Sequence, residues 1–302
     1  MPRFHDMISF QQVHKFLLKT PEQKRVTARF LATRCLARLP YAPHKVRMRM
    51  PPSEDVSFWW SCFPGGVGPE AESIFAYWGD DTGDLRLLWR LLQPGMTFFD
   101  VGAYHGVYTI IAGKRLGHSG SVVAFEPSPR ERRWLRFHLR CNGIKSVKVE
   151  PYAVAGEEGK ASLRVAAEGY TTMNSLRQPA VDRPVTRIEV QTVTLDGYLK
   201  CKRVDELHFI KMDAEGAELE ILRGADRLLS EFRPLLICEV LDLVTRPWGY
   251  PAREIVNHLR TYDYEWFDIL HDGSVRPHSQ RDQYPEVRNY LAVPQEKQDR
   301  LQ

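Results

Sequence analysis

The stretch Thr97-Phe98-Phe99-Asp100-Val101-Gly102-Ala103-Tyr104-His105-Gly106 decides the fold. It predicts a buried apolar strand that ends in a turn with two glycines four residues apart. Downstream, Ser121-Val122-Val123-Ala124-Phe125-Glu126-Pro127 predicts a second strand that ends in an acid. A strand, a glycine turn, a helix and a second strand with a terminal carboxylate form half of a nucleotide-binding fold.

The glycine spacing restricts which nucleotide fits the turn. A dinucleotide turn carries G-x-G-x-x-G because its backbone must approach a pyrophosphate, but here Tyr104 stands between Gly102 and Gly106. S-adenosylmethionine has no phosphate; it needs an open turn for its amino-acid tail and an acid, here Glu126, that accepts from both ribose hydroxyls. The alternative is an ordinary βαβ turn followed by a surface glutamate. An acid about 20 residues after the turn favours the cofactor site.

The composition is that of a soluble globular protein, with 302 residues, 43% hydrophobic and 26% charged. No apolar run approaches the ~20 residues of a membrane helix, and we expect no secretory signal. The cysteines are scattered singly, which argues against a disulfide framework or a zinc site and for a reducing, cytoplasmic location. They are Cys35, Cys62, Cys141, Cys201 and Cys238.

Positive charge is concentrated at the start of the chain. Residues 1–50 hold 11 basic and 2 acidic residues and so carry +9, which leaves −5 for the remainder of a chain whose net charge is +4. Such a segment could contact an anionic membrane surface. The alternative is the solvated face of helices, since apolar residues are interleaved throughout. We expect no nucleic-acid partner.

Two regions are predicted, an N-terminal helical and irregular extension over residues 1–69 and an α/β domain over residues 70–302. In the domain, strands alternate with helices, which predicts a parallel sheet with right-handed crossovers. Predicted strands are 97–101, 121–126, 147–154, 207–212, 235–240, 265–270 and 289–293, with helices at 85–92, 107–116, 129–141, 217–229 and 252–262. Residues 156–195 interrupt this alternation with a predicted hairpin, whose polar loop spans residues 169–184.

A block of acids follows the strand over residues 207–212. Asp213 stands at the carboxyl end of that strand, where ligands bind in an open α/β sheet, and is the first candidate for a base or substrate ligand. Asp213, Glu215 and Glu218 lie within six residues of one another. The alternative is that these acids only supply negative charge at the N-terminus of the next helix. Glu239 ends the next strand, where a carboxylate after four apolar residues needs a partner or exposure. Two or three such carboxylates could hold Mg²⁺, but we predict no metal site.

Two further residues near the glycine turn carry candidate chemistry. Asp100 is either a helix cap or an acceptor near the cationic end of the cofactor. His105 could accept a proton near neutral pH and ranks below Asp213 as a catalytic candidate.

These motifs together resemble the FkbM family of S-adenosylmethionine-dependent methyltransferases, over about residues 70–294. The resemblance rests on Phe99–Ala103 with Gly106, on Ala124–Pro127, on Thr194–Asp196 and on Phe209–Glu218; Asn174–Leu176 and Asn289–Val293 also match. The block at 209–218, in order with the others, is far more specific than the first two motifs. One departure is Tyr104-His105 where the family usually has Asn-Ile. Either the cofactor tail is held differently here, or an aromatic wall replaces an amide contact.

The resemblance implies a Rossmann-like class I methyltransferase fold, a seven-stranded, mostly parallel sheet of order 3-2-1-4-5-7-6. It implies O-methylation of a hydroxyl on a sugar or secondary metabolite. We assign the cofactor site to Asp100, Gly102, Ala103, Tyr104, Gly106, Glu126, Pro127 and Ala153. The candidate catalytic residues are Asp213, His105 and Glu239, and the candidate acceptor contacts are Asn174 and Glu215.

Two other functions remain open. A nicotinamide oxidoreductase is disfavoured by the missing middle glycine and by the Asp213 block. A non-enzymatic adaptor would keep the fold and bind a partner or membrane through residues 1–50.

Overall fold

The structure, a computed structural model, describes residues 45–49, 57–61, 83–166, 173–179 and 184–301. Most of the predicted N-terminal helical and irregular extension over residues 1–69, and the boundary between the two predicted regions, lie outside these residues. In the described part of the chain, no helix has the length and apolar character that a bilayer-spanning segment needs.

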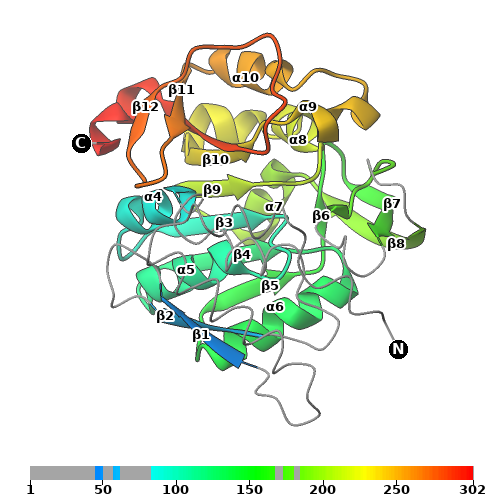
Figure 1. Ribbon diagram of the computed structural model, residues 1–302, viewed down its shortest axis with the longest axis vertical. Coiled ribbons are helices and arrows are strands. Elements are labelled where there is room, and N and C mark those ends of the chain that lie inside the picture. Colours follow the sequence, from blue (N-terminus) through cyan, green and yellow to red (C-terminus); the bar gives the residue numbers. More distant parts are fainter. Residues whose placement is uncertain (1–44, 50–56, 62–82, 167–172, 180–183, 302) are drawn as a thin grey trace, which may run out of the picture.

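One large sheet forms the centre of the domain (Figure 1). Its order is β5-β4-β3-β9-β10-β13-β11-β12, and β13 runs antiparallel to β10 and β11. This confirms the predicted order 3-2-1-4-5-7-6, to which the short β12 adds an eighth strand at the edge. The strands are β3 (Thr97–Val101), β4 (Ser121–Phe125), β5 (Val147–Glu150), β9 (Phe209–Met212), β10 (Leu235–Glu239), β11 (Tyr264–Ile269), β12 (Val275–Pro277) and β13 (Asn289–Pro294).

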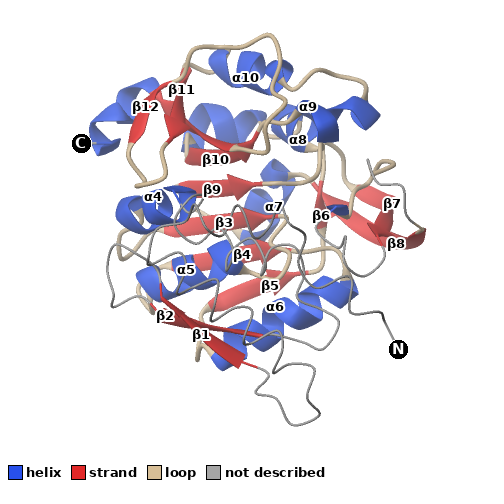
Figure 2. Ribbon diagram, in the orientation of Figure 1, coloured by secondary structure: helices blue, strands red, loops and turns tan. Residues whose placement is uncertain are grey.

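Helices cover both faces of this sheet (Figure 2). Successive strand residues point to opposite faces; Phe98 packs in the core with α4 and α5, and Phe99 in the core with α7, α8 and α10. Both rings are fully buried, and each burial stabilises the fold by about 1.5–3 kcal/mol. The helices are α4 (Gly83–Leu91), α5 (Val107–Leu116), α6 (Pro129–Cys141), α7 (Leu195–Lys202), α8 (Glu218–Arg223), α9 (Asp242–Thr245) and α10 (Arg253–Arg260), with short π or 3₁₀ turns at Leu228–Phe232, Arg246–Trp248 and Gln295–Leu301.

A small second sheet, β6-β8-β7, lies beside the carboxyl ends of the central strands. The predicted hairpin is confirmed as β7 (Gly159–Ala166) and β8 (Val185–Val193). The prediction of a single strand over 147–154 is wrong. Pro151 has no N–H to donate, so the chain leaves the central sheet after β5. Residues Ala153–Val154 then form β6, which pairs with β8 in the small sheet.

Two other predictions are corrected. Residues 57–61, predicted as part of an irregular connection, form strand β2 (Ser57–Ser61), which pairs with β1 (Lys45–Arg49). The helix predicted over 217–229 ends at Gly224, and a separate π-helical turn follows it.

Candidate active site

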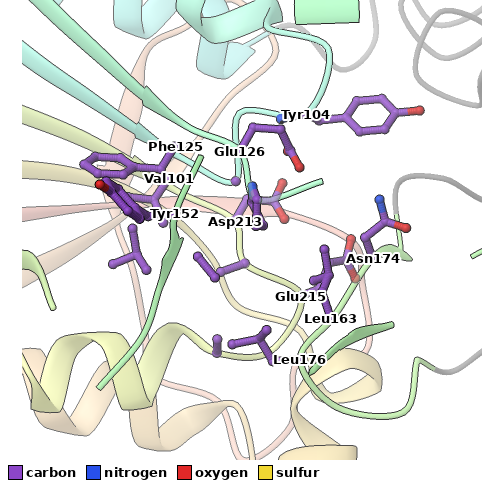
Figure 3. A pocket seen from close by; sticks show the side chains of 16 residues that line it. Val101, Tyr104, Phe125, Glu126, Tyr152, Leu163, Asn174, Leu176, Asp213 and Glu215 are labelled. Atoms are coloured by element: carbon purple, nitrogen blue, oxygen red, sulfur yellow. Dashed lines mark hydrogen bonds between the residues drawn. The ribbon is translucent and has the colours of Figure 1, made fainter. Parts of the chain in front are cut away.

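A pocket lies at the carboxyl ends of β3, β4 and β9, closed on its far side by the small sheet (Figure 3). This is the edge at which open α/β sheets bind their ligands. Glu126 and Asp213 lie in the middle of its wall, and the Tyr104 ring extends away from the centre. The lining residues are Val101, Gly102, Tyr104, Phe125, Glu126, Pro127, Tyr152, Ala153, Val154, Leu163, Asn174, Leu176, Asp213, Ala214, Glu215 and Ala217.

The glycines of the turn are required by close packing within the protein. Gly102 has φ +75°, and a Cβ there would lie 1.8 Å from the carbonyl oxygen of Asp213. Gly106 has φ +92°, and its Cβ would lie 2.2 Å from a methyl carbon of Leu135. Both Cβ positions are therefore filled by protein atoms, whereas the sequence suggested that the glycines leave room for a cofactor tail.

Glu126 closes the turn from the end of β4. Its Oε2 accepts from the backbone N–H of Tyr104 at 2.8 Å and its Oε1 from that of Ser128 at 2.8 Å. Burial raises the pKa of this carboxyl to about 8, although these two hydrogen bonds oppose the shift. Each oxygen keeps acceptor capacity beyond the backbone bond. Glu126 can therefore receive two donors from a ligand in the pocket.

Behind the turn, His105 is engaged with α6 instead of the pocket. Its Nε2 lies 2.9 Å from Oε2 of Glu131, and its ring stacks on Tyr104 with 3.7 Å between centroids. Burial lowers the pKa of His105, whereas the pKa of Glu131 lies below its ordinary value because His105 and Arg130 outweigh the effect of burial. The Nε2–H of His105 therefore donates a hydrogen bond to the Glu131 carboxylate. The side chain of His138 holds the other side of the turn, donating to the His105 carbonyl over 2.9 Å.

Asp213 lies where the acid block of the sequence meets the pocket. Its Oδ2 accepts from Nζ of Lys211 at 2.8 Å, and its side chain is 31% exposed, against 3% for Lys211. The Lys211 ammonium also lies over the Tyr108 ring, 4.6 Å from its centroid. The Asp213 carboxylate is therefore accessible to a ligand and oriented by a buried cation.

Two buried carboxylates stand close to Asp213. Asp213, Glu218 and Glu239 each offer an oxygen that lies within 4.8 Å of the other two. Burial, together with repulsion from Asp213, raises the pKa of Glu218 to about 7, and burial followed by repulsion from Asp213 and Glu215 raises that of Glu239 well above its ordinary value. Glu218, the first residue of α8, also accepts from the Ala214 N–H at 2.6 Å.

The small sheet is tied to the glutamates around the pocket. Asn174 accepts from the Ala166 N–H at 3.0 Å and donates to Oε1 of Glu131 at 3.2 Å. The carbonyl of Glu215, a residue with φ 53°, accepts from the Ser175 hydroxyl at 2.9 Å. These contacts hold the β7–β8 hairpin beside the glycine turn. They also place Asn174 and Glu215, the residues predicted to contact the methyl acceptor, in the pocket wall.

The structure brings together eight of the predicted site residues in the pocket wall: Gly102, Tyr104, Glu126, Pro127, Ala153, Asn174, Asp213 and Glu215. Ala103, His105, Gly106, Asp100 and Glu239 stand outside that wall. Asp100 is fully buried, where its Oδ2 accepts from the Thr109 hydroxyl and burial raises its pKa. The functional role of each residue stays a prediction.

Sequence reasoning missed part of the wall. Tyr152, Leu163 and Leu176 come from the small sheet and its approaches, and their position depends on how that sheet packs, which has no local signal. Ala214 and Ala217 lie inside the acid block. Because they follow the end of a strand, the sequence could have predicted that they line the pocket.

Comparisons with known proteins agree on one class. A family model described as the methyltransferase FkbM domain matches residues 100–298. The curated protein "Methyltransferase 1" of Beauveria bassiana (strain ARSEF 2860) is 21% identical over 143 residues, which are 42% of this chain and 57% of that protein. The chain thus spans little more than half the length of this relative.

Solved structures show a more distant similarity. The methyltransferase FkbM from Methylobacillus flagellatus KT has a TM-score of 0.42 and 19% identity, with 67% of this chain and 44% of that one covered. The O-methyltransferase from Bacillus cereus in complex with SAH has a TM-score of 0.41 and 15% identity, with 94% and 96% covered.

Proposed function

The chain belongs to the family of methyltransferase FkbM domains, and from this premise we propose that it transfers a methyl group from S-adenosylmethionine to a hydroxyl of a sugar or secondary metabolite. The observation that carries the proposal is the buried Glu126 carboxylate at the end of β4, held by the backbone of the glycine turn at 2.8 Å. Its remaining acceptor capacity suits the two ribose hydroxyls. A ribose diol presents two such donors. NAD also carries ribose diols, so the choice of S-adenosylmethionine rests on the family and on Tyr104, which stands where a dinucleotide turn has its middle glycine.

Methyl transfer from a sulfonium is an in-line displacement that depends on alignment of oxygen, methyl carbon and sulfur. The bond from sulfur to methyl breaks as the bond from the acceptor oxygen to methyl forms, which leaves S-adenosylhomocysteine. The hydroxyl proton must go to a base, because an alkyl hydroxyl is a poor nucleophile. In this proposal Asp213 takes that proton, since it combines exposure to the pocket with orientation by Lys211.

His105 and Glu239 are weaker candidates for the same role. His105 is held by Glu131 on the far side of the turn, and Glu239 is buried beside Asp213. Asn174 and Glu215 stand where the small sheet meets the pocket, so in this proposal they contact the acceptor. Contact of residues 1–50 with a membrane surface stays a prediction.

The test begins with cofactor choice. Thermal shift with S-adenosylmethionine, S-adenosylhomocysteine, NAD and NADP should show stabilisation by the first two alone. Glu126→Ala should abolish the shift, whereas the matched variant Glu157→Ala, at an exposed site, should retain it. Incubation with methyl-labelled cofactor and a metabolite extract should then yield a labelled methyl ether, identified by mass spectrometry.

Each alternative gives a different result. Stabilisation by NAD or NADP would overturn the methyltransferase assignment. Cofactor binding without label transfer, together with binding to anionic vesicles that requires residues 1–50, would favour the adaptor.

A further inference from the structure

Three carboxylates from separate segments converge beside the pocket. Asp213 follows β9, Glu218 begins α8 and Glu239 ends β10, and one oxygen from each lies within 4.8 Å of the other two. Ligands on opposite sides of Mg²⁺ stand about 4.2 Å apart, and those across Ca²⁺ about 5 Å apart, from the usual metal–oxygen distances. The spacing of these oxygens therefore suits a hard divalent cation.

Two of these side chains have buried oxygens without a partner. Oε2 of Glu218 and Oε2 of Glu239 make no hydrogen bond, and the residues are 0% and 8% exposed. Buried carboxylate oxygens are normally satisfied, so each such atom calls for an explanation. A cation at the meeting point of the three carboxylates would supply the missing partner for both oxygens.

The charge balance points the same way. Lys211 is already paired with Asp213 at 2.8 Å. When ionised, three carboxylates and one ammonium carry a net charge of −2 in a buried setting, where uncompensated charge is costly. A divalent cation would match this charge.

A neutral side chain shares a face of the sheet with Glu239. Asn289 of β13 is directly opposite Glu239 in the sheet register, and directly opposite residues present their side chains to the same face. Its Oδ1 is buried without a partner, while its Nδ2 donates to Asp84 at 2.7 Å and to Tyr108 at 3.1 Å. An amide oxygen is an accepted ligand for hard cations.

We propose that Asp213, Glu218 and Glu239 form a binding site for one hard divalent cation, with Asn289 as an additional oxygen donor. Carboxylate and amide oxygens without nitrogen or sulfur ligands suit Mg²⁺, Ca²⁺ or Mn²⁺ rather than zinc. Asp213 belongs to both the pocket wall and this site, so the cation would be a direct neighbour of the acceptor pocket. The proposal stands on the geometry of the cluster and does not depend on methyl transfer.

The experiment measures cation binding by the full chain without cofactor or acceptor. Protein stripped with EDTA is titrated with MnCl₂, and free Mn²⁺ is followed by electron paramagnetic resonance. The wild type should bind one Mn²⁺, which Mg²⁺ or Ca²⁺ displaces. Glu239→Gln and Glu218→Gln should each weaken binding by about tenfold or more. The matched control Glu220→Gln, on the same helix but paired with Arg223 at the surface, should bind as the wild type does.

A melting curve without cation separates loss of the site from loss of the fold. Glutamine resembles a protonated glutamate, so both variants should melt at or above the wild-type temperature, and Mn²⁺ should raise the melting temperature of the wild type and the control only. Absence of Mn²⁺ binding by the wild type at millimolar concentration would overturn the proposal. In that case the three carboxyl groups are held together by protons that they share. An affinity for Mn²⁺ equal to that of the wild type in Glu239→Gln and Glu218→Gln would also overturn it. Neither result bears on cofactor binding, which is measured separately.

Discussion

Cofactor affinity should rise with pH, because Glu126 must be ionised to accept both ribose hydroxyls well. Burial raises the pKa of this carboxyl to about 8 in the cofactor-free protein, so it is mostly protonated at neutral pH. Hydrogen bonds donated to a carboxylate favour its ionised form. Binding of a ribose diol must therefore release the proton.

The size of the effect follows from the pKa. If the bound carboxyl stays ionised, the apparent Kd is weakened about 100-fold at pH 6 and about tenfold at pH 7 relative to the alkaline limit, or ~2.7 kcal/mol at pH 6. The same group acts oppositely on the stability of the free protein. Its raised pKa stabilises the fold below the ordinary value of 4.5, and this contribution is lost as pH rises through about 8.

Calorimetry between about pH 6 and pH 8.5 tests this linkage. 5′-Methylthioadenosine is the suitable ligand, because it keeps the ribose diol and lacks the titratable amino-acid tail. Titrations in two buffers of different ionisation enthalpy should show release of nearly one proton at neutral pH. Glu126→Gln should bind weakly with a flat pH profile.

The matched control is Glu150→Gln, at the end of the neighbouring strand β5. Although burial opposes it, hydrogen bonds from Lys148 and Tyr198 hold the pKa of Glu150 below its ordinary value, so this variant should keep the wild-type slope. Equal wild-type affinity at both ends of the pH range would refute the assignment of Glu126 to the ribose.

Two substitutions test the remainder of the site. Asp213→Asn should leave cofactor Kd unchanged by calorimetry and lower turnover on the identified acceptor by roughly 10²–10⁴-fold, the usual contribution of a general base; full turnover would remove Asp213 as the base. Gly102→Ala should destabilise the fold in urea by about 3 kcal/mol or more, since its Cβ would lie 1.8 Å from the Asp213 carbonyl. Gly143→Ala, with φ +68° but open space around it, should cost only about 1 kcal/mol, and equal losses in the two variants would contradict this packing argument.

Local signals predicted those elements whose ends are marked in the sequence. The helices at 107–116 and 129–141 match α5 and α6 to the residue, because Gly117 stops the first and Pro129 begins the second. The prediction of one strand over 147–154 is wrong because Pro151 has no N–H, so the pairing with β4 ends at Glu150. Sheet order came from family resemblance, since strand order is a long-range property.

The residues of the site also fall into two groups, those that local sequence signals predict and those whose position depends on tertiary packing. Strand ends placed Glu126 and Asp213 at one edge of the sheet from sequence alone. The partner of His105 could not be found this way, because Glu131 lies 26 residues away and only the packing of α6 against the turn brings them together. The convergence of Glu218 with Glu239 depends likewise on tertiary packing, because one begins α8 and the other ends β10.

Gly102 shows why the glycine turn and the acid block occur together in one chain. The turn ends β3 and the block follows β9, and these strands are neighbours in the sheet with Val101 opposite Met212. The Asp213 N–H donates to the Val101 carbonyl at 3.1 Å, and the Asp213 carbonyl fills the space that any side chain on Gly102 would need. A larger residue at 102 would displace the backbone that positions the Asp213 carboxylate. The glycine is thus a requirement of the backbone that positions the candidate base, which couples two motifs 111 residues apart.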